Sequence, residues 1–243
     1  MKSSTTTTIL SISLLTVCII TLLGFSYADK IEKRITSINI TIIDDLDSKF
    51  LSVLRVRTHL DAYGKIVGEL ENDILLEEIH AHLTNIPSVR KAIIYPNLNG
   101  EIVIELTQRK AQARLHTGKG LDYYLDELGK AMPLDRNYTA RVPVIHAENL
   151  EEAGYAITFL KQIKDDEFWE PLIDQIIVHS LGEIEIIPRI GARIFLGNSI
   201  DPEELRNNLI TFYRAQIKTG NLKNYSLIDL SYKNQVIAKR HVY

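Results

Sequence analysis

The sequence predicts an α+β protein in which one N-terminal transmembrane helix precedes two folded regions of mixed helix and strand. Three observations lead to this class. An uncharged apolar run lies near the N-terminus, and β-branched segments alternate with segments of helical periodicity after it. Hydrophobic residues make up 45% of the 243 positions and charged residues 24%, a balance typical of globular domains.

The composition excludes several classes of function. The 28 Lys and Arg residues and 31 Asp and Glu residues give a formal net charge of −3, so the chain lacks the basic field that attracts nucleic acid. The single cysteine, Cys18, lies inside the N-terminal apolar run. Neither a disulfide framework nor a thiolate metal site can therefore form within one chain.

The first expected element is a membrane helix. The segment ILSISLLTVCIITLLGF, residues 9–25, carries no charge. Extended to Ala28 it reaches 20 residues, or about 30 Å of helix, which is the thickness of a bilayer core. We therefore expect a short cytoplasmic tail at residues 1–8 and a transmembrane anchor at 9–28.

The flanks of this run leave an alternative open. Only Lys2 precedes it, whereas Lys30, Lys33 and Arg34 follow it, so the positive-inside rule gives poor support for a cytoplasmic N-terminus. Small residues at its end also fit a signal-peptidase site, although the run is longer than a usual signal core. A retained anchor is the favoured interpretation over a cleaved signal peptide. In both cases residues 29–243 are exported.

The next region has the order strand, helix, helix, strand, strand. Residues 34–42 are rich in isoleucine and favour a strand, and residues 44–47 supply turn and capping groups. The first helix, at residues 50–60, is expected to place Phe50, Leu51, Leu54 and Leu60 on one stripe. In the second helix, Asn72 or Asp73 is the expected N-cap, and Pro87 marks the end. The apolar side of this helix is formed by Leu75, Leu76, Ile79 and Leu83.

Two strands joined by a turn complete this region. Residues 89–95 and 101–107 flank the sequence PNLNG, and Ile102, Ile104 and Leu106 fall on one face of the second strand. A sheet of this kind can be covered by two helices on one face and leave the other face or an edge for a partner.

The second half predicts a sheet with flanking helices. Asn149 and Glu152 form a capping-box-like start for a helix to Lys164, while Asp201 and Gly220 bound a helix that ends near Lys218. Strands are expected at residues 173–178, 183–187 and 193–196. The segments LIDLSY and QVIAKR predict a terminal hairpin.

No residue pattern favours an enzyme. His80 and His82, the only close histidine pair, point in different directions on a helix and cannot chelate a metal together. The sequence HTGKG at residues 116–120 lacks the first glycine of a P-loop and predicts a hairpin turn. Trp169 is expected in the core. A solvated turn is the favoured interpretation of the clustered carboxylates Asp122, Asp126 and Glu127.

Three groups of residues carry a family resemblance. They match, in order, a helix-to-strand passage, a strand followed by arginine, and an "L-V-D-x-x-G" hairpin. The groups are Leu83, Pro87, Val89 and Ala92; Ile102, Ile104, Gln108, Arg109 and Ala113; and Leu125, Asp126 and Gly129. With the N-terminal anchor and the terminal hairpin, the chain resembles the FtsQ/DivIB family of bacterial cell-division proteins, in the form found in Bacteroidota. Ser88 and Ala111 depart from the motif, where the family often has an aromatic residue and a proline.

The resemblance implies a polypeptide-transport-associated (POTRA) domain with a short linker at residues 29–110 and an FtsQ-type β-domain at 111–243. It implies a single-pass inner-membrane protein, mainly periplasmic, that acts at the division septum without catalysis or cofactor and helps control septal peptidoglycan synthesis. Its C-terminal strands would bind FtsB, itself paired with FtsL, while the POTRA domain contacts other division proteins. By this resemblance, the residues expected to bind the partner are Ile228, Leu230, Tyr232, Gln235, Val236, Ile237, Ala238, Lys239 and Arg240.

Other interpretations stay open at this point. The same terminal residues also fit an ordinary closing hairpin. An exported POTRA module with a cleaved signal peptide, serving outer-membrane protein assembly or secretion, is the alternative function. A periplasmic hydrolase is a third.

Overall fold

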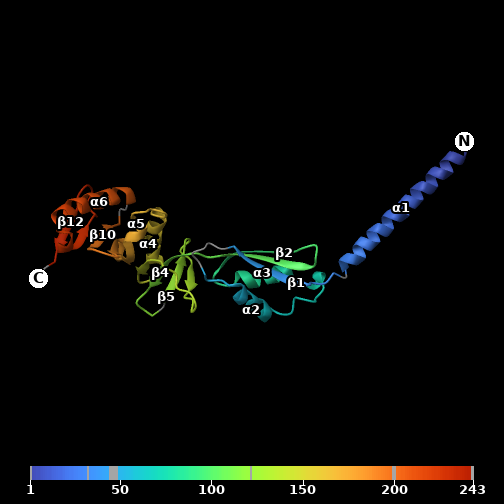
Figure 1. Cartoon of the computed structure of the whole chain (residues 1–243), viewed down its shortest axis with the longest axis horizontal. Coiled ribbons are helices and arrows are strands. Elements are labelled where there is room, and N and C mark those ends of the chain that lie inside the picture. The colour runs from blue at the N-terminus through green and yellow to red at the C-terminus, as the bar shows by residue number, and fades with distance from the viewer. Residues whose placement is uncertain (1, 32, 44–48, 121, 199–200, 242–243) are drawn as a thin grey trace. The chain divides into compact units, whose positions relative to one another are not determined.

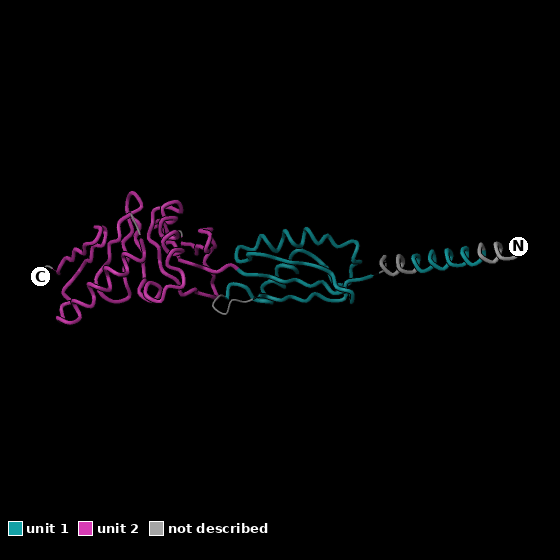
Figure 2. The backbone as a smooth tube through the Cα atoms, turned by 90° about the horizontal axis from the view of Figure 1, so that it is seen from above, with its two compact units in different colours: residues 1–108 teal, residues 109–243 magenta. Residues whose placement is uncertain are grey.

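The structure is a computed structural model that describes residues 2–31, 33–43, 49–120, 122–198 and 201–241. Helices and strands are mixed along the chain (Figure 1), which confirms the predicted α+β class. The chain divides into two compact units, residues 1–108 and 109–243 (Figure 2). The two units are described separately below.

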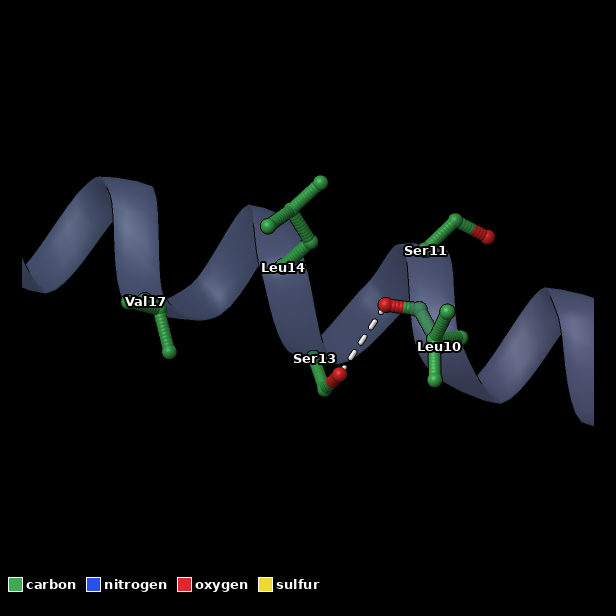
Figure 3. A pocket seen from close by; sticks show the side chains of 5 residues that line it. All are labelled: Leu10, Ser11, Ser13, Leu14 and Val17. Carbon is green, nitrogen blue, oxygen red and sulfur yellow. Dashed lines mark hydrogen bonds between the residues drawn. The ribbon is translucent and has the colours of Figure 1, made fainter.

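The N-terminal element is the helix α1, Lys2–Ile31. Large apolar side chains are exposed along its described part, from Leu10 to Leu23. A shallow depression on α1 is bounded by this helix alone and has no opposing wall (Figure 3). Among the described residues, no helix combines the length and the apolar character needed to cross a membrane.

The rest of the first unit is a three-stranded sheet with two helices. Strand β1 (Ser37–Ile43) pairs in parallel with β3 (Glu101–Gln108), and β2 (Val89–Pro96) pairs with β3 in antiparallel, giving the order β1-β3-β2. Helices α2 (Val53–Tyr63) and α3 (Leu76–Thr84) contribute to the same core as the buried face of the central strand. As expected, Ile102, Ile104 and Leu106 lie on that face.

The starts of both helices differ from the sequence prediction. Helix α2 begins after Ser52, whose Oγ accepts a hydrogen bond from the Arg55 N–H. Phe50 and Leu51 are buried just before it, but Leu54 is 76% exposed, so the predicted stripe is wrong at that position. The physical reason is that Phe50 and Leu51 precede the helix, so its core-facing side is formed by Val56 and Leu60, and Leu54, two and six positions before them, projects to another side.

The predicted cap of α3 is also wrong. Asn72 and Asp73 belong to a separate 3-10 turn, η1 (Glu71–Asp73), and α3 follows Leu75 without a side-chain cap. The capping groups expected at residues 44–47 lie outside the described residues.

The second unit is built on a nine-stranded sheet with the order β12-β11-β10-β9-β8-β7-β4-β5-β6. Its core lies between this sheet and the helices α4 (Leu150–Gln162), α5 (Trp169–Leu172) and α6 (Pro202–Thr219). The strands are β4 (Ala111–His116), β5 (Asp122–Asp126), β6 (Ala131–Pro133), β7 (Val144–His146), β8 (Ile173–Val178), β9 (Ile184–Pro188), β10 (Arg193–Gly197), β11 (Tyr225–Asp229) and β12 (Ile237–Arg240). Short 3-10 turns are η2 (Ser180–Gly182) and η3 (Leu222–Asn224).

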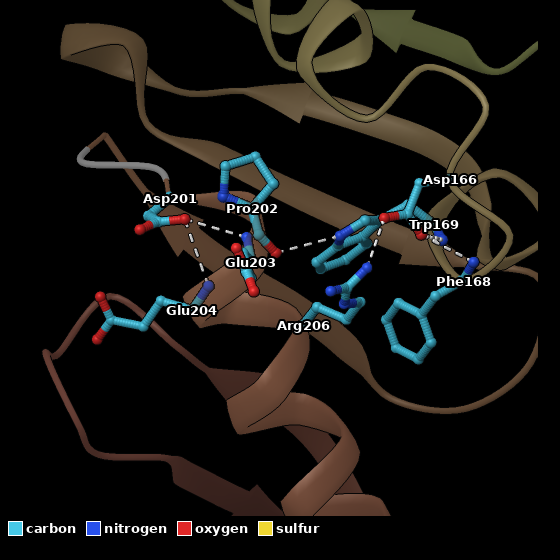
Figure 4. Close-up of polar contacts among 8 residues, drawn as sticks. All are labelled: Asp166, Phe168, Trp169, Asp201, Pro202, Glu203, Glu204 and Arg206. Carbon is cyan, nitrogen blue, oxygen red and sulfur yellow. Dashed lines mark hydrogen bonds and ion pairs between the residues drawn. The ribbon is translucent and has the colours of Figure 1, made fainter.

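The capping residues of the helices in this unit agree with the sequence, although α4 ends at Gln162, two residues before the predicted Lys164. The Asn149 side chain accepts from the Glu152 N–H at 2.9 Å, Asp201 caps α6, and Gly220 ends α6 in the left-handed region at φ 69°. Trp169 is fully buried, as expected, and its Nε1–H donates to the Pro202 carbonyl at 3.3 Å (Figure 4). The start of α6 is thereby tied to the core.

Asp126 corrects the expectation of a solvated carboxylate cluster. Its side chain is only 7% exposed and lies 3.4 Å from the Arg109 Nε. Its Oδ1 accepts hydrogen bonds from the backbone N–H groups of Leu128 and Lys130. Two of the residues behind the family resemblance, Arg109 and Asp126, therefore form a buried ion pair that organises the β5–β6 turn.

Candidate functional site at the C-terminal sheet edge

The last strand, β12, lies at one end of the nine-stranded sheet (Figure 1). Within the described part of the chain it pairs only with β11, in antiparallel, with Asp229 opposite Ile237, Ile228 opposite Ala238 and Leu227 opposite Lys239. Such an edge strand presents N–H and C=O groups that have no partner in the sheet. A strand from another protein could pair with them.

Backbone directions identify which residues face the free side of β12. The Leu230 N–H donates to the Phe195 carbonyl of β10. The backbone N–H and C=O groups of successive residues in a strand point alternately toward one neighbouring strand and toward the other. The backbone groups of Ile228 therefore also point toward β10, and those of Asp229 point toward β12. Its opposite residue, Ile237, therefore directs its backbone groups toward β11. The backbone N–H and C=O groups of Ala238 point away from β11, toward the free side.

The far end of β12 follows the same alternation. The His241 N–H donates to the Asn224 carbonyl at 2.9 Å, which places residue 241 on the inward-facing set with 237 and 239. The pairing shifts by one residue between Tyr225 and Leu227, and the Ser226 hydroxyl donates to the Lys239 carbonyl at 3.2 Å. The Ser226 hydroxyl also donates to the Arg240 carbonyl at 3.4 Å, so of the Arg240 backbone groups only the N–H joins those of Ala238 on the outward-facing set.

The residues expected to bind a partner divide into buried and exposed groups. Ile228 and Leu230 are core residues, 0% and 3% exposed, so they support the edge and do not offer their side chains to a partner. Val236 packs partly against the same core, and Ala238 is half-buried. The exposed members are Tyr232, Gln235, Ile237, Lys239 and Arg240.

The exposed side chains of β12 are apolar and cationic. Ile237 is 42% exposed, and the neighbouring positions Lys239 and Arg240 carry positive charge. The Arg240 guanidinium lies 6.0 Å from the centre of the Tyr225 ring, at the outer limit of a cation–π contact. A complementary strand would combine apolar and acidic side chains.

The other histidines and carboxylates do not form a familiar catalytic arrangement in the described residues. No group of three or more His, Cys, Asp or Glu residues there is placed to hold a metal ion. Sequence spacing directed attention to His80 and His82, but the fold instead brings His116 and His146 together, with ring centres 5.4 Å apart. Their 30-residue separation gives no local signal, because the contact depends on the parallel pairing of β4 with β7.

One comparison with known proteins identifies a related family. A family model described as "FtsQ/DivIB, C-terminal related" matches residues 111–239. The matched segment runs from β4 to Lys239 in β12, and it covers more than half of the chain. No curated protein matches the sequence.

Proposed function

The chain belongs to the FtsQ/DivIB, C-terminal related family, and from this membership we propose that it is a non-catalytic cell-division scaffold whose strand β12 binds another division protein. Family membership supports a role in cell division. The specific claim of the proposal is strand addition, in which a partner segment continues the sheet of the second unit beyond β12.

The observation that carries this proposal is the open edge formed by the backbone N–H and C=O of Ala238 and the N–H of Arg240. These outward groups supply main-chain hydrogen bonds, which give strand addition its affinity. Ile237, exposed beside them, supplies apolar contact, while Lys239 and Arg240 favour acidic partner side chains. The same charges discourage uncontrolled pairing between identical edges, since like charges repel.

Family membership suggests which proteins would supply the added strand. We propose that the partner is an FtsB-type protein paired with FtsL. The remaining contacts of the scaffold would come from residues 29–110, which we propose to be a POTRA domain. The observed order β1-α2-α3-β2-β3 supports that assignment. In this proposal the scaffold joins division proteins and helps control septal peptidoglycan synthesis.

We further propose that residues 9–28 anchor the chain in the inner membrane at the septum, with the folded units in the periplasm. Support comes from the 20-residue uncharged run and from the exposed apolar side chains that α1 carries between Leu10 and Leu23. N-terminal sequencing of the mature protein tests this step. Cleavage after Ala28 would contradict the anchor and favour the exported module with a signal peptide.

In-cell photo-crosslinking tests the binding surface. A photoreactive residue at Ile237 is expected to trap a small membrane protein of the FtsB type, whereas the same residue at Lys164, an exposed position in the turn after α4, is not. Capture of outer-membrane assembly factors at residue 237 would instead favour the alternative function. Equal capture at both positions would contradict a specific edge.

A backbone variant separates strand addition from side-chain contact. Ala238→Pro removes an outward N–H and should leave the hydrogen bonds between β11 and β12 in place. Ala238→Val changes the side chain but keeps the N–H. The proposal predicts that capture at residue 237 is lost in Ala238→Pro and retained in Ala238→Val, at equal folding measured by Trp169 fluorescence. Equal capture by both variants would refute strand addition.

A further inference from the structure

The sheet of the second unit has a face that its helices do not cover. Leu115, Ile145, Ile176 and Ile186 are almost fully buried in the core. Their neighbours along each strand point to the opposite face, because side chains alternate. The strand registers align these neighbours in one row: Asp122, His116, His146, Ile177, Glu185, Phe195, Asp229 and Ile237.

Two imidazole rings are adjacent in this row. His116 on β4 and His146 on β7 are direct partners in a parallel pair, so their side chains leave the same face of the sheet side by side. Their ring centres lie 5.4 Å apart, with an angle of 76° between the ring planes. The His116 side chain is 43% exposed, so ions from solvent can reach it.

Each ring is held from its outer side by an oxygen acceptor. The His116 Nδ1 lies 2.9 Å from Asp122 Oδ1 on β5, and the His146 Nε2 lies 2.7 Å from Gln175 Oε1 on β8. Asp122 is itself held in place by a hydrogen bond that the Arg114 guanidinium donates to its Oδ2.

These contacts leave one nitrogen of each ring for another ligand. In a histidine ring the two nitrogens point to opposite sides. The contact strands β5 and β8 lie outside the β4–β7 pair. The remaining nitrogens, Nε2 of His116 and Nδ1 of His146, therefore lie on the sides of the two rings that face away from Asp122 and Gln175. A hydrogen-bonded oxygen behind each imidazole is the usual arrangement of metal-binding histidines, because it fixes the tautomer and the ring orientation.

We propose that His116 and His146 form a binding site for a divalent late-transition-metal ion such as Zn²⁺, with water completing the coordination. Neutral imidazole suits Zn²⁺, Cu²⁺ and Ni²⁺ in preference to Mg²⁺ or Ca²⁺. Asp122 and Gln175 are positioning residues that hold the two rings. Because only two protein ligands bind the ion, chelators remove it readily. The site is independent of the proposed division role.

The test is a calorimetric titration of the full chain, in neutral detergent at pH 7.5, with ZnCl₂. The site predicts saturable binding of one ion per chain, and His116→Ala or His146→Ala should weaken it at least tenfold. Gln175→Ala should weaken it about tenfold or more, as expected for loss of an outer-shell contact. Mg²⁺ should give no saturable signal.

His179→Ala is the matched control. His179 lies 2.8 Å from Glu185 and follows β8 in the same unit, but it is not the partner of a second imidazole. Zn²⁺ affinity should be unchanged in this variant. The proposal is overturned if wild-type protein shows no saturable binding, if binding persists in the His116→Ala/His146→Ala double variant, or if His179→Ala loses it equally. Trp169 fluorescence in urea without metal verifies that each variant is folded.

A second readout uses stability. Zn²⁺ that binds only the folded chain raises the urea midpoint of the wild type in proportion to the logarithm of its concentration, once the site is saturated. The double variant should show no rise. A rise of equal size in the double variant would place the ion elsewhere.

Discussion

Replacing Asp126 should destabilise the second unit strongly. Asp126 and Arg109 are 7% and 10% exposed, and their charged groups lie 3.4 Å apart. Removing one partner of a buried ion pair costs about 3 to 5 kcal/mol. In Asp126→Ala the buried Arg109 would lose its ion pair and keep its other contacts, among them the hydrogen bond from its Nη1 to the Ala131 carbonyl. The N–H groups of Leu128 and Lys130 also lose an acceptor, but they belong to a turn at which water can replace it. Asp126→Ala is therefore expected to lose about 3 to 5 kcal/mol of unfolding free energy.

Urea unfolding followed by tryptophan fluorescence measures this loss in the second unit, which contains Asp126. Trp169 is the only tryptophan, and it is fully buried in the core of the second unit. With a slope of about 2 kcal/mol per molar urea, the midpoint should fall by about 1.5 to 2.5 M. Asp126→Asn should lose less, because its amide oxygen can still accept from the turn.

Glu127→Gln is the matched control at the neighbouring position. Glu127 lies 3.7 Å from Lys164, with side-chain exposures of 31% and 52%, so this pair should contribute at most about 1 kcal/mol. If Asp126→Ala lowered the midpoint no more than Glu127→Gln, the buried ion pair would not be the stabilising feature described here.

Two further predictions concern a glycine and a tyrosine. Gly100→Ala should cost about 1 to 3 kcal/mol more than Gly118→Ala in thermal unfolding followed by circular dichroism. Both glycines have positive φ, but a Cβ at Gly100 would lie 2.7 Å from the Arg34 carbonyl oxygen, and one at Gly118 meets nothing within 4 Å; equal costs would contradict this. Burial raises the pKa of Tyr213 from 10.0 to about 12, so its contribution to stability is full below pH 10 and is lost as pH rises toward 12. Tyr213→Phe should therefore reduce the fall in urea midpoint over that pH range, and an unchanged fall would exclude Tyr213 as its source.

Local signals predicted much of the fold. Asn149, Asp201 and Gly220 bound their helices as expected, because each acts on backbone groups within a few residues of itself. The two strands of the PNLNG hairpin were also predicted from signals that lie within a few residues of the turn. Leu54 was predicted wrongly because Phe50 and Leu51 were placed inside the helix, whereas α2 begins at Val53 and its buried residues are Val56 and Leu60.

Contacts between residues far apart in the sequence could not be predicted. Asp126 was expected in water because its turn is charged, whereas its burial depends on Arg109, 17 positions earlier. The pairing of His116 with His146 depends on the register of two parallel strands, which a single sequence does not specify. For the C-terminal edge, the resemblance supplied the candidate residues, but it could not separate buried Ile228 from exposed Ile237.

Amide hydrogen exchange at single-residue resolution tests the central claim of strand addition most directly. The protein is compared alone and saturated with the partner captured at residue 237. We expect the Ala238 and Arg240 amides to gain protection on binding, because their N–H groups face the free edge. The Ile237 and Lys239 amides, already directed toward β11, should change little. Saturating binding without new protection at residues 238 and 240 would show that the partner does not extend this sheet.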